Sequence, residues 1–153
     1  MGAEDRLREL GIELPPAPQP VASYVPVSVS GSLAYVAGMV PISDGKLMWT
    51  GKLGDELDVP AGAEATRRCG LQALAALRSE LGSLDRVKRI VRVGVFVCSA
   101  SGFTDQSKVA NGASDLFIEV FGDAGRHART AVGVPELPLG SPVEVEVIAE
   151  ISP

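Results

Sequence analysis

Cysteine and histidine are scarce in this chain of 153 residues. Cys69 and Cys98 are its two cysteines, and His127 is its one histidine. Two widely separated thiols do not suggest a disulfide framework, and so few soft ligands do not suffice for a zinc site. A catalytic pair of cysteine and histidine is an alternative, but both cysteines stand in apolar runs, where a small buried thiol is the commoner outcome. The sequence therefore predicts no metal centre.

An excess of positive charge and a long hydrophobic run are also missing. The formal net charge is −5, which argues against duplex nucleic acid as the main partner. The local basic cluster of Arg86, Lys88, Arg89 and Arg92 is interpreted as a solvated face. No apolar run approaches the length of a bilayer span, and the opening MGAEDRLREL has no signal-peptide core. We expect a soluble, cytoplasmic protein that does not contact a membrane.

The composition indicates one compact domain. Hydrophobic residues make up 46% of the chain and charged residues 22%, a balance that favours a folded protein over a disordered one. A chain of this length suits a single core. Residues 1–19 begin with a possible short helix and become proline-rich, which predicts an N-terminal arm extended on the surface. Residues 20–153 are predicted to form the domain.

Hydrophobic periodicity places the secondary structure. Two β-prone runs flank Ser30-Gly31-Ser32, where glycine can supply the positive φ of a tight turn, so a hairpin is predicted over residues 24–41. Further strands are expected around residues 46–49, 90–98, 130–134 and 143–151. Long helices are expected over residues 61–81 and 109–121, where apolar residues recur at helical spacing. Gly82 can end the first helix, and Ser83 with Asp85 can cap the brief turn that follows.

This order of elements favours an α+β fold, in which helices pack on one face of a sheet. In the run from Val143 to Val147 the valines point to one face, while Glu144 and Glu146 point to the other. In the strand at 90–98 we expect Val91, Val93, Val95 and Val97 to share a face. The second face of the sheet is mixed in polarity. It closes by symmetric association or is solvated in a monomer, and periodicity leaves both open.

Four motifs in order resemble the reactive intermediate deaminase family, also known as Rid, YjgF/UK114 or L-PSP endoribonuclease-like. They are SYVPVSVSGSLAYVAGMVP, LGSLDRVKRIVRVGVFV, FTDQSKVANGASDLFIEVFG and ARTAVGVPELPLGSPVEVEVIAEI, and the resemblance covers residues 20–151. It implies a chorismate-mutase-like α+β fold, a mixed sheet with two long helices on one face. It further implies a homotrimer whose sheets form a central barrel with ligand sites in clefts between subunits. The implied reaction hydrolyses 2-imino or 2-enamino acids to 2-keto acids and ammonia without a cofactor.

The resemblance also implies residue roles. Arg129 matches the arginine that grips the substrate carboxylate, and Glu144 matches the glutamate that holds or activates water. We expect Glu144 to present this water from the strand adjoining Arg129. Tyr24, Gly38 and Asn111 match residues that line the cleft. A guanidinium can make two parallel charge-assisted hydrogen bonds to a carboxylate, a geometry that lysine cannot reproduce.

Three positions depart from the family pattern. Ala37, Met39 and Ala131 replace a frequent serine, glutamine and cysteine, so the predicted pocket loses polar groups. We expect these changes to alter substrate choice or activity. His127 is close to Arg129 in the chain, and its two interpretations are a general base and a loop residue near a helix end. Glu146 points the same way as Glu144 and could be confused with it.

Alternatives to the deaminase hypothesis remain at this point. A noncatalytic trimer that binds small carboxylates would be stabilised by its ligand without accelerating a reaction. Ribonuclease activity follows only from the older family label, and the acidic charge argues against it. Structural roles are also open: Arg129 could form an interface ion pair, Tyr24 could be a packing residue, and Asn111 could satisfy backbone groups at the start of its helix.

Overall fold

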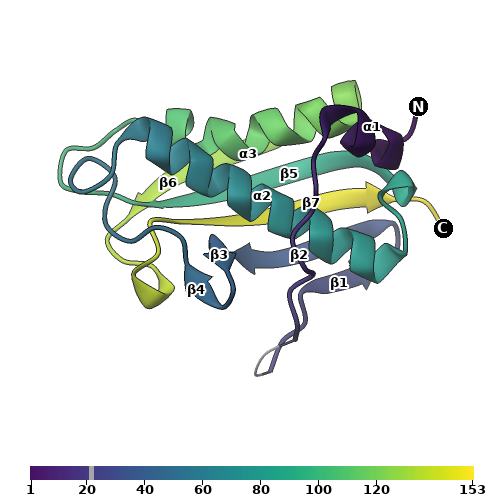
Figure 1. Cartoon of the computed structure of the whole chain (residues 1–153), viewed down its shortest axis with the longest axis horizontal. Coiled ribbons are helices and arrows are strands. Elements are labelled where there is room, and N and C mark those ends of the chain that lie inside the picture. Colours follow the sequence, from purple (N-terminus) through teal and green to yellow (C-terminus); the bar gives the residue numbers. More distant parts are fainter. Residues whose placement is uncertain (21–22) are drawn as a thin grey trace.

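A five-stranded mixed sheet forms the centre of the computed structural model, which describes residues 1–20 and 23–153. Its strands are β1 (Val27–Ser30), β2 (Leu33–Met39), β5 (Val87–Cys98), β6 (Ala128–Val134) and β7 (Val143–Ile151). They lie side by side in the order β1-β2-β7-β5-β6 (Figure 1). β5 and β6 are parallel, and every other neighbouring pair is antiparallel. The predicted α+β class and mixed sheet are confirmed.

The predicted hairpin is formed by β1 and β2. Gly31 has φ of 60° at its turn, in the left-handed region that glycine adopts without a steric penalty. The strand predicted at residues 46–49 is only partly right. β4 (Lys46–Leu47) pairs for two residues with β3 (Ile42–Ser43), and the strand does not continue through Trp49.

Two long helices, α2 (Val59–Leu81) and α3 (Gln106–Phe121), lie side by side over one face of the sheet (Figure 1). The Asp58 side chain caps α2 by accepting a hydrogen bond from the Ala61 amide, and Gly82 ends the helix with φ of 84°. The helices approach closely at Gly112, where an added Cβ would lie 1.8 Å from the Ala63 carbonyl oxygen. This position therefore requires glycine.

The core fills the space between these helices and the sheet. Five residues of β7 alternate into it and are almost fully covered: Val143, Val145, Val147, Ala149 and Ile151. In β5 the prediction that Val91 shares a face with Val93 is wrong. The pairing register with β7 shifts between Ile90 and Arg92, so Ile90 is buried while Val91 is only partly covered. A β-bulge moves the alternation by one residue and causes this change.

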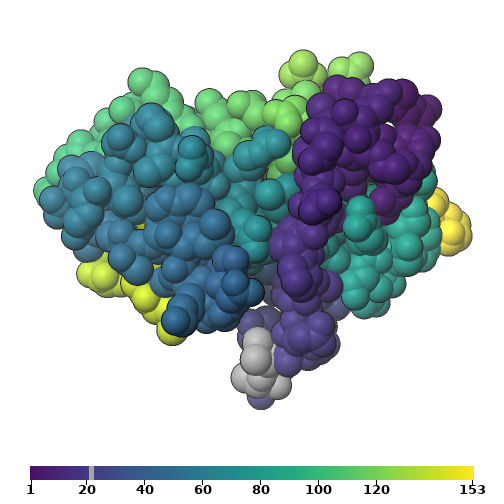
Figure 2. All heavy atoms as spheres, viewed as in Figure 1, coloured from purple at the N-terminus to yellow at the C-terminus, as the bar shows by residue number. Residues whose placement is uncertain are grey.

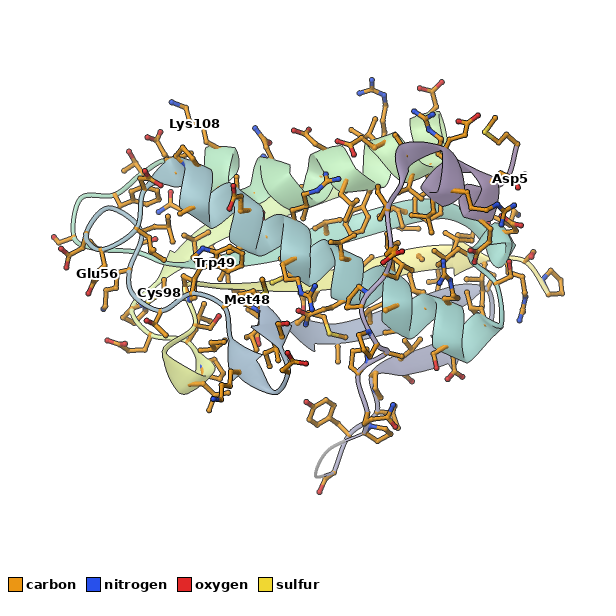
Figure 3. The ribbon with its side chains drawn as sticks, in the orientation of Figure 1. Asp5, Met48, Trp49, Glu56, Cys98 and Lys108 are labelled. Carbon is orange, nitrogen blue, oxygen red and sulfur yellow. The ribbon has the colours of Figure 1, made fainter. Side chains whose placement is uncertain are left out.

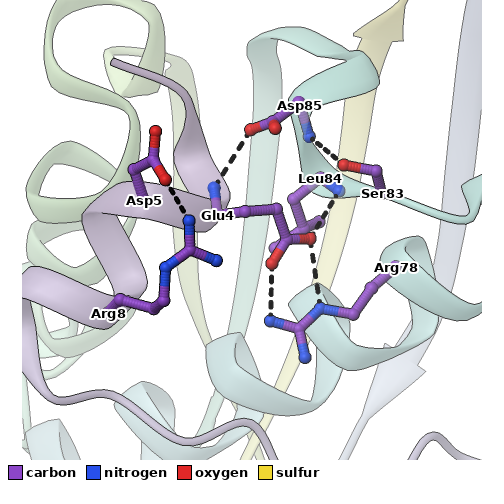
Figure 4. A network of polar contacts seen from close by, with 7 residues as sticks. All are labelled: Glu4, Asp5, Arg8, Arg78, Ser83, Leu84 and Asp85. Atoms are coloured by element: carbon purple, nitrogen blue, oxygen red, sulfur yellow. Dashed lines mark hydrogen bonds and ion pairs between the residues drawn. The ribbon is translucent and has the colours of Figure 1, made fainter.

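The helix expected at the start of the chain is α1 (Ala3–Leu10), and it packs against the end of the helical layer. Leu7 is 2% exposed and belongs to the main hydrophobic core. The Glu4 carboxylate accepts hydrogen bonds from Arg78 of α2 and from the Leu84 amide, while Asp85 accepts from the Glu4 amide (Figure 4). This network joins α1 to the end of α2.

The proline-rich segment after α1 crosses the helical layer as an extended chain, visible as a purple ridge in Figure 2. In the turn beneath α1, the Ser83 hydroxyl accepts a hydrogen bond from the Asp85 amide, as predicted. Among residues 1–20 and 23–153, no helix combines the length and apolar character needed to cross a bilayer. The same residues contain no group of three or more side chains placed to hold a metal ion.

Candidate functional site

Arg129 projects from the edge strand β6 towards α3. It pairs in register with Val93 of β5, whose side chain is buried beneath the helices, so Arg129 points to the helical face of the sheet. The guanidinium Nη1 donates to Asn111 Oδ1 at 2.8 Å and to Ser114 Oγ at 3.1 Å. Nη2 donates to the Ser107 carbonyl oxygen at 3.3 Å. Side chain and backbone oxygens of α3 therefore hold the arginine from one side.

The number of N–H donors on Arg129 shows how many of them remain available to a ligand. An arginine has five N–H groups, and three of those of Arg129 donate to the oxygens of α3. Both hydrogens of Nη1 are used. Within the described residues, the Nε–H and one Nη2–H make no hydrogen bond. These two neighbouring donors can take the two oxygens of one carboxylate.

Ser114 and His127 extend this arrangement behind the arginine. His127 Nε2 lies 2.8 Å from Ser114 Oγ, and its Nδ1 lies 2.6 Å from the Gly125 carbonyl oxygen. Burial lowers the pKa of His127, and repulsion from the Arg129 charge lowers it further, against the Gly125 hydrogen bond. The Phe117 ring packs edge-on against the imidazole, with 6.0 Å between centroids. These surroundings therefore favour the neutral form of the imidazole.

A small open cleft of about 210 Å³ lies beside these groups. Its lining consists of Ser114, Ile118, Arg126, His127 and Arg129. The cleft has two guanidinium groups and no carboxylate in its lining, although the chain is acidic as a whole. The positive charge of this lining attracts an organic anion towards Arg129.

Glu144 lies on the opposite face of the sheet. Its neighbours in β7, Val143 and Val145, are buried under the helices, so alternation directs Glu144 to the open face. Its side chain covers Gly38 of β2, where an added Cβ would lie 2.9 Å from the carboxyl carbon. Burial raises the pKa of Glu144, and the nearby Glu146 raises it further. This carboxyl group can therefore exchange a proton more readily near neutral pH than an ordinary glutamate.

Tyr24 and Ala37 line two clefts on the β1–β2 side of the molecule. A cleft of 360 Å³ extends over the open face to Arg92 and Glu146, and one of 540 Å³ lies between the proline-rich segment and β2. Met39 lines the larger cleft. Tyr24 is 56% exposed, so within one chain it is a wall residue and not a core residue.

The expected site residues thus form two groups. Arg129, Asn111 and Ala131 lie on the helical side at the β6 edge, because Ala131 pairs with the buried Val95. The other group is at the open face and the β2 side: Tyr24, Ala37, Gly38 and Glu144. The expectation that Glu144 would act from the strand adjoining Arg129 is wrong, because β5 separates β7 from β6. One chain does not bring the two residues together.

Ser114 is the residue that sequence reasoning missed. It follows Asn111 by three positions on α3, and residues with this spacing lie on one face of a helix. Once Asn111 is considered beside Arg129, the same spacing points to Ser114.

The catalytic pair of cysteine and histidine finds no support in the structure. Both hydrogen bonds of His127 go to Ser114 and Gly125. Cys98 lies at the end of the molecule remote from α1, beside Glu56 in Figure 3, and its thiol donates to the Pro135 carbonyl oxygen. Burial raises the pKa of both thiols, which keeps them protonated and weakly nucleophilic.

Comparisons with known proteins agree on one family. The model described as "YjgF/chorismate mutase-like, putative endoribonuclease" matches residues 4–151. Protein TCP17 of Trypanosoma cruzi is 49% identical over 147 residues, which cover 95% of this chain and 92% of that protein. The crystal structure of Atu1372 from Agrobacterium tumefaciens is 41% identical, with a TM-score of 0.90 over 99% of this chain and 94% of that one. The YjgF gene product of E. coli is 26% identical, with a TM-score of 0.62 over 88% and 92% of the two chains.

Proposed function

Because the chain belongs to the YjgF/chorismate mutase-like family, we propose that it hydrolyses reactive 2-imino and 2-enamino acids to 2-keto acids and ammonia. The observation that carries this proposal is the hydrogen bonding of Arg129. Its guanidinium is fixed on α3 by three oxygen acceptors and keeps two neighbouring N–H groups for a ligand. A carboxylate bound there would hold the neighbouring imine carbon at a defined place.

The chemistry demands little more than a placed water and a proton carrier. Water adds to the carbon of the protonated imine, and its oxygen loses a proton as the C–O bond forms. The amino nitrogen gains a proton, and the C–N bond breaks as the C=O bond forms. The hydroxyl oxygen then gives its remaining proton to the departing ammonia, so that a 2-keto acid and an ammonium ion result. Glu144 is the group proposed to take the proton from water and return it to nitrogen, because its raised pKa suits both steps.

Opposite placement of Arg129 and Glu144 supports a site shared between copies of the chain. We propose that the arginine of one protomer faces the glutamate of its neighbour in a homotrimer. The open face favours association, because it exposes Tyr35, which pairs with the partly covered Ile148, and also exposes Val132 on β6. Closed symmetry would bury this surface and create equivalent clefts.

The pocket composition favours a substrate with an aliphatic side chain. Ala37, Met39 and Ala131 contribute no side-chain hydrogen-bonding group at positions expected to line the cleft. A polar substrate side chain would lose its hydration there without gaining a partner. We therefore expect 2-iminobutanoate and 2-iminopropanoate to be hydrolysed faster than imino acids with a polar side chain.

The test follows the decay of 2-iminobutanoate by absorbance while a dehydratase generates it in place. Wild type should accelerate the decay, and Arg129→Ala should lower kcat/KM by about 100-fold or more, because it removes a two-pronged charged contact. The kcat/KM of Arg129→Lys should remain below roughly a tenth of the wild-type value, since an ammonium cannot present two parallel donors. Arg8→Ala, on the exposed side of α1, is the matched control and should leave the rate unchanged.

Equal decay with and without the wild-type protein would reject the deaminase function for this substrate. If 2-oxobutanoate then still raised the melting temperature of wild type and not of Arg129→Ala, the noncatalytic carboxylate-binding function would be favoured.

A further inference from the structure

The hydrogen-bond pattern behind Arg129 fixes the direction of each proton. The Gly125 carbonyl oxygen can only accept, so His127 Nδ1 must carry a hydrogen and donate to it. In the neutral imidazole Nε2 is then an acceptor, and the Ser114 hydroxyl donates to it. The hydroxyl proton is thereby turned away from Arg129, and a lone pair of Ser114 Oγ is left to accept from Nη1.

We propose that Ser114 and His127 are positioning residues, which together hold the Arg129 guanidinium on α3 with its two spare N–H groups ready for the ligand carboxylate. The inference rests on the carboxylate-binding role of Arg129 in the proposed function. Ser114 is 7% exposed and lies within α3, so it is too covered to attack a substrate and acts through the arginine.

Protonation of His127 disturbs this arrangement. The imidazolium Nε2–H would become a second cationic donor to the Ser114 oxygen, which already accepts from the guanidinium at 3.1 Å. Two positive groups would then converge on one atom, and the hydroxyl proton would need another acceptor. A ligand carboxylate on the far edge of the guanidinium lies farther from the imidazole than the guanidinium does. Its attraction for the imidazolium is therefore weaker than the repulsion between the imidazolium and Arg129. The docked arginine therefore requires a neutral His127.

The charged groups around the imidazole agree with this direction. Arg129 faces it from β6, and Arg126 lines the same cleft from the preceding loop. α3 contributes the uncharged Ser114, Ile118 and Phe117. The carboxylate of Asp123 pairs with Arg126 at 3.6 Å. The described surroundings of His127 thus oppose its protonation.

Because the chain has a single histidine, its titration can be followed without ambiguity by NMR of untagged protein labelled at the histidine ring. We expect His127 to titrate below its ordinary value of 6.5, and Arg129→Ala to raise its pKa by removing the repulsion. Saturation with 2-oxobutanoate should lower the pKa further in wild type, because the ligand binds the form with a neutral imidazole. A 2-keto acid stays ionised throughout this window, so the ligand itself does not titrate.

Two variants separate positioning from simple support of the fold. Ser114→Ala should weaken 2-oxobutanoate binding about tenfold at neutral pH, and raise KM for the imine with little change in kcat, because a hydrogen bond to a charged group is lost. Ser114→Thr keeps the hydroxyl and should recover most of the affinity. His127→Gln keeps an acceptor that cannot titrate. This variant should bind 2-oxobutanoate normally at neutral pH. Its binding should not weaken, as wild-type binding does, when pH falls through the His127 pKa.

The outcomes are separable from those of the proposed function, because titration and binding need no turnover. If 2-oxobutanoate binds with the expected pH dependence but no imine is hydrolysed, the positioning role stands and the deaminase function fails. If wild type and His127→Gln show the same pH dependence of binding, or if the ligand raises the pKa of His127, the positioning role is overturned. Absence of any binding of 2-oxobutanoate overturns the positioning role, while the deaminase function is still decided by the decay of the imine.

Discussion

The two faces of the central sheet use the same strand in opposite ways. On the helical face, β7 places Val143, Val145 and Val147 in a core from which water is excluded. On the open face the same strand presents Glu144 and Glu146, each covering a glycine of a neighbouring strand. The alternation of a single strand thus separates the residues that hold the fold from residues that are free to serve a site.

Arg129 differs from the other residues on the helical face, because it is a candidate site residue and not a core residue. It lies on the helical side, but at the edge strand β6, where the helices no longer cover the sheet completely. Its position lets α3 orient the guanidinium while its outer edge stays accessible. A site that combines it with Glu144 therefore needs a second copy of the chain, and the apolar part of the open face is the surface proposed for that contact.

The largest effect should follow from a change that disturbs the helical face alone. Gly112→Ala places a methyl group 1.8 Å from the Ala63 carbonyl oxygen and 2.5 Å from Thr66 Oγ1, so α2 and α3 must separate. We expect the free energy of unfolding to fall by about 3 kcal/mol or more, as for severe overpacking of a core. Unfolding in urea measures the loss.

Asp115→Ala is the matched control for that experiment. Asp115 is exposed on α3, so its replacement should change the free energy of unfolding by less than about 0.5 kcal/mol. A similar loss in both variants would mean that α3 is sensitive to alanine in general, and the assigned role of the glycine contact would be wrong.

We expect a substitution on the open face to have a smaller effect on folding but a large effect on association. Tyr35 is 43% exposed there, and Tyr35→Asp places a charge on the surface proposed to join the subunits. We expect sedimentation to show monomers, with loss of imine hydrolysis and retention of the circular dichroism of the fold. Val29→Asp is the counterpart. Val29 is also exposed on the hairpin but shares the helical side with its partner Ala34, so this variant should remain a trimer.

Much of the fold could be predicted because its signals are local. The last strand begins and ends at the predicted residues 143 and 151, and Gly31 and Gly82 end their elements as expected. The first long helix begins at Val59 and not at residue 61, although Asp58 and the following proline were a visible start signal. Local signals could not predict that Ile90, and not Val91, lies in the core, because the bulge arises from the pairing of β5 with β7.

The resemblance named candidate site residues but not their arrangement. It pointed to Arg129, and the structure shows the guanidinium hydrogen-bonded to Asn111 and Ser114. The face to which Arg129 points depends on the parallel pairing of β6 with β5, a contact between segments that are distant in sequence. No periodicity within either strand specifies that pairing. The separation from Glu144 by a whole sheet could therefore be recognised only in three dimensions.

The smallest effects should appear within the open face, where two glutamates of β7 have opposite pKa shifts. Burial and Glu146 raise the pKa of Glu144 above 4.5, so the folded state holds its proton more tightly than the unfolded state. Stability then falls as pH rises from 4.5 through the raised value. Hydrogen bonds from Arg89 and Lys88 lower the pKa of Glu150 below 4.5, so its contribution is present above 4.5 and is lost as pH falls through the lowered value.

Glutamine variants should reveal this contrast. Glu144→Gln should become more stable than wild type as pH rises above 4.5, while Glu150→Gln should be less stable there, and both differences should diminish as pH falls. Urea unfolding between about pH 3 and pH 7, at one protein concentration, measures both series. About 0.5 M salt should reduce the Glu150 difference most, because its ion pairs are exposed. Slopes of the same sign for both variants would contradict the view that the open face keeps one carboxyl group in an environment suited to proton transfer.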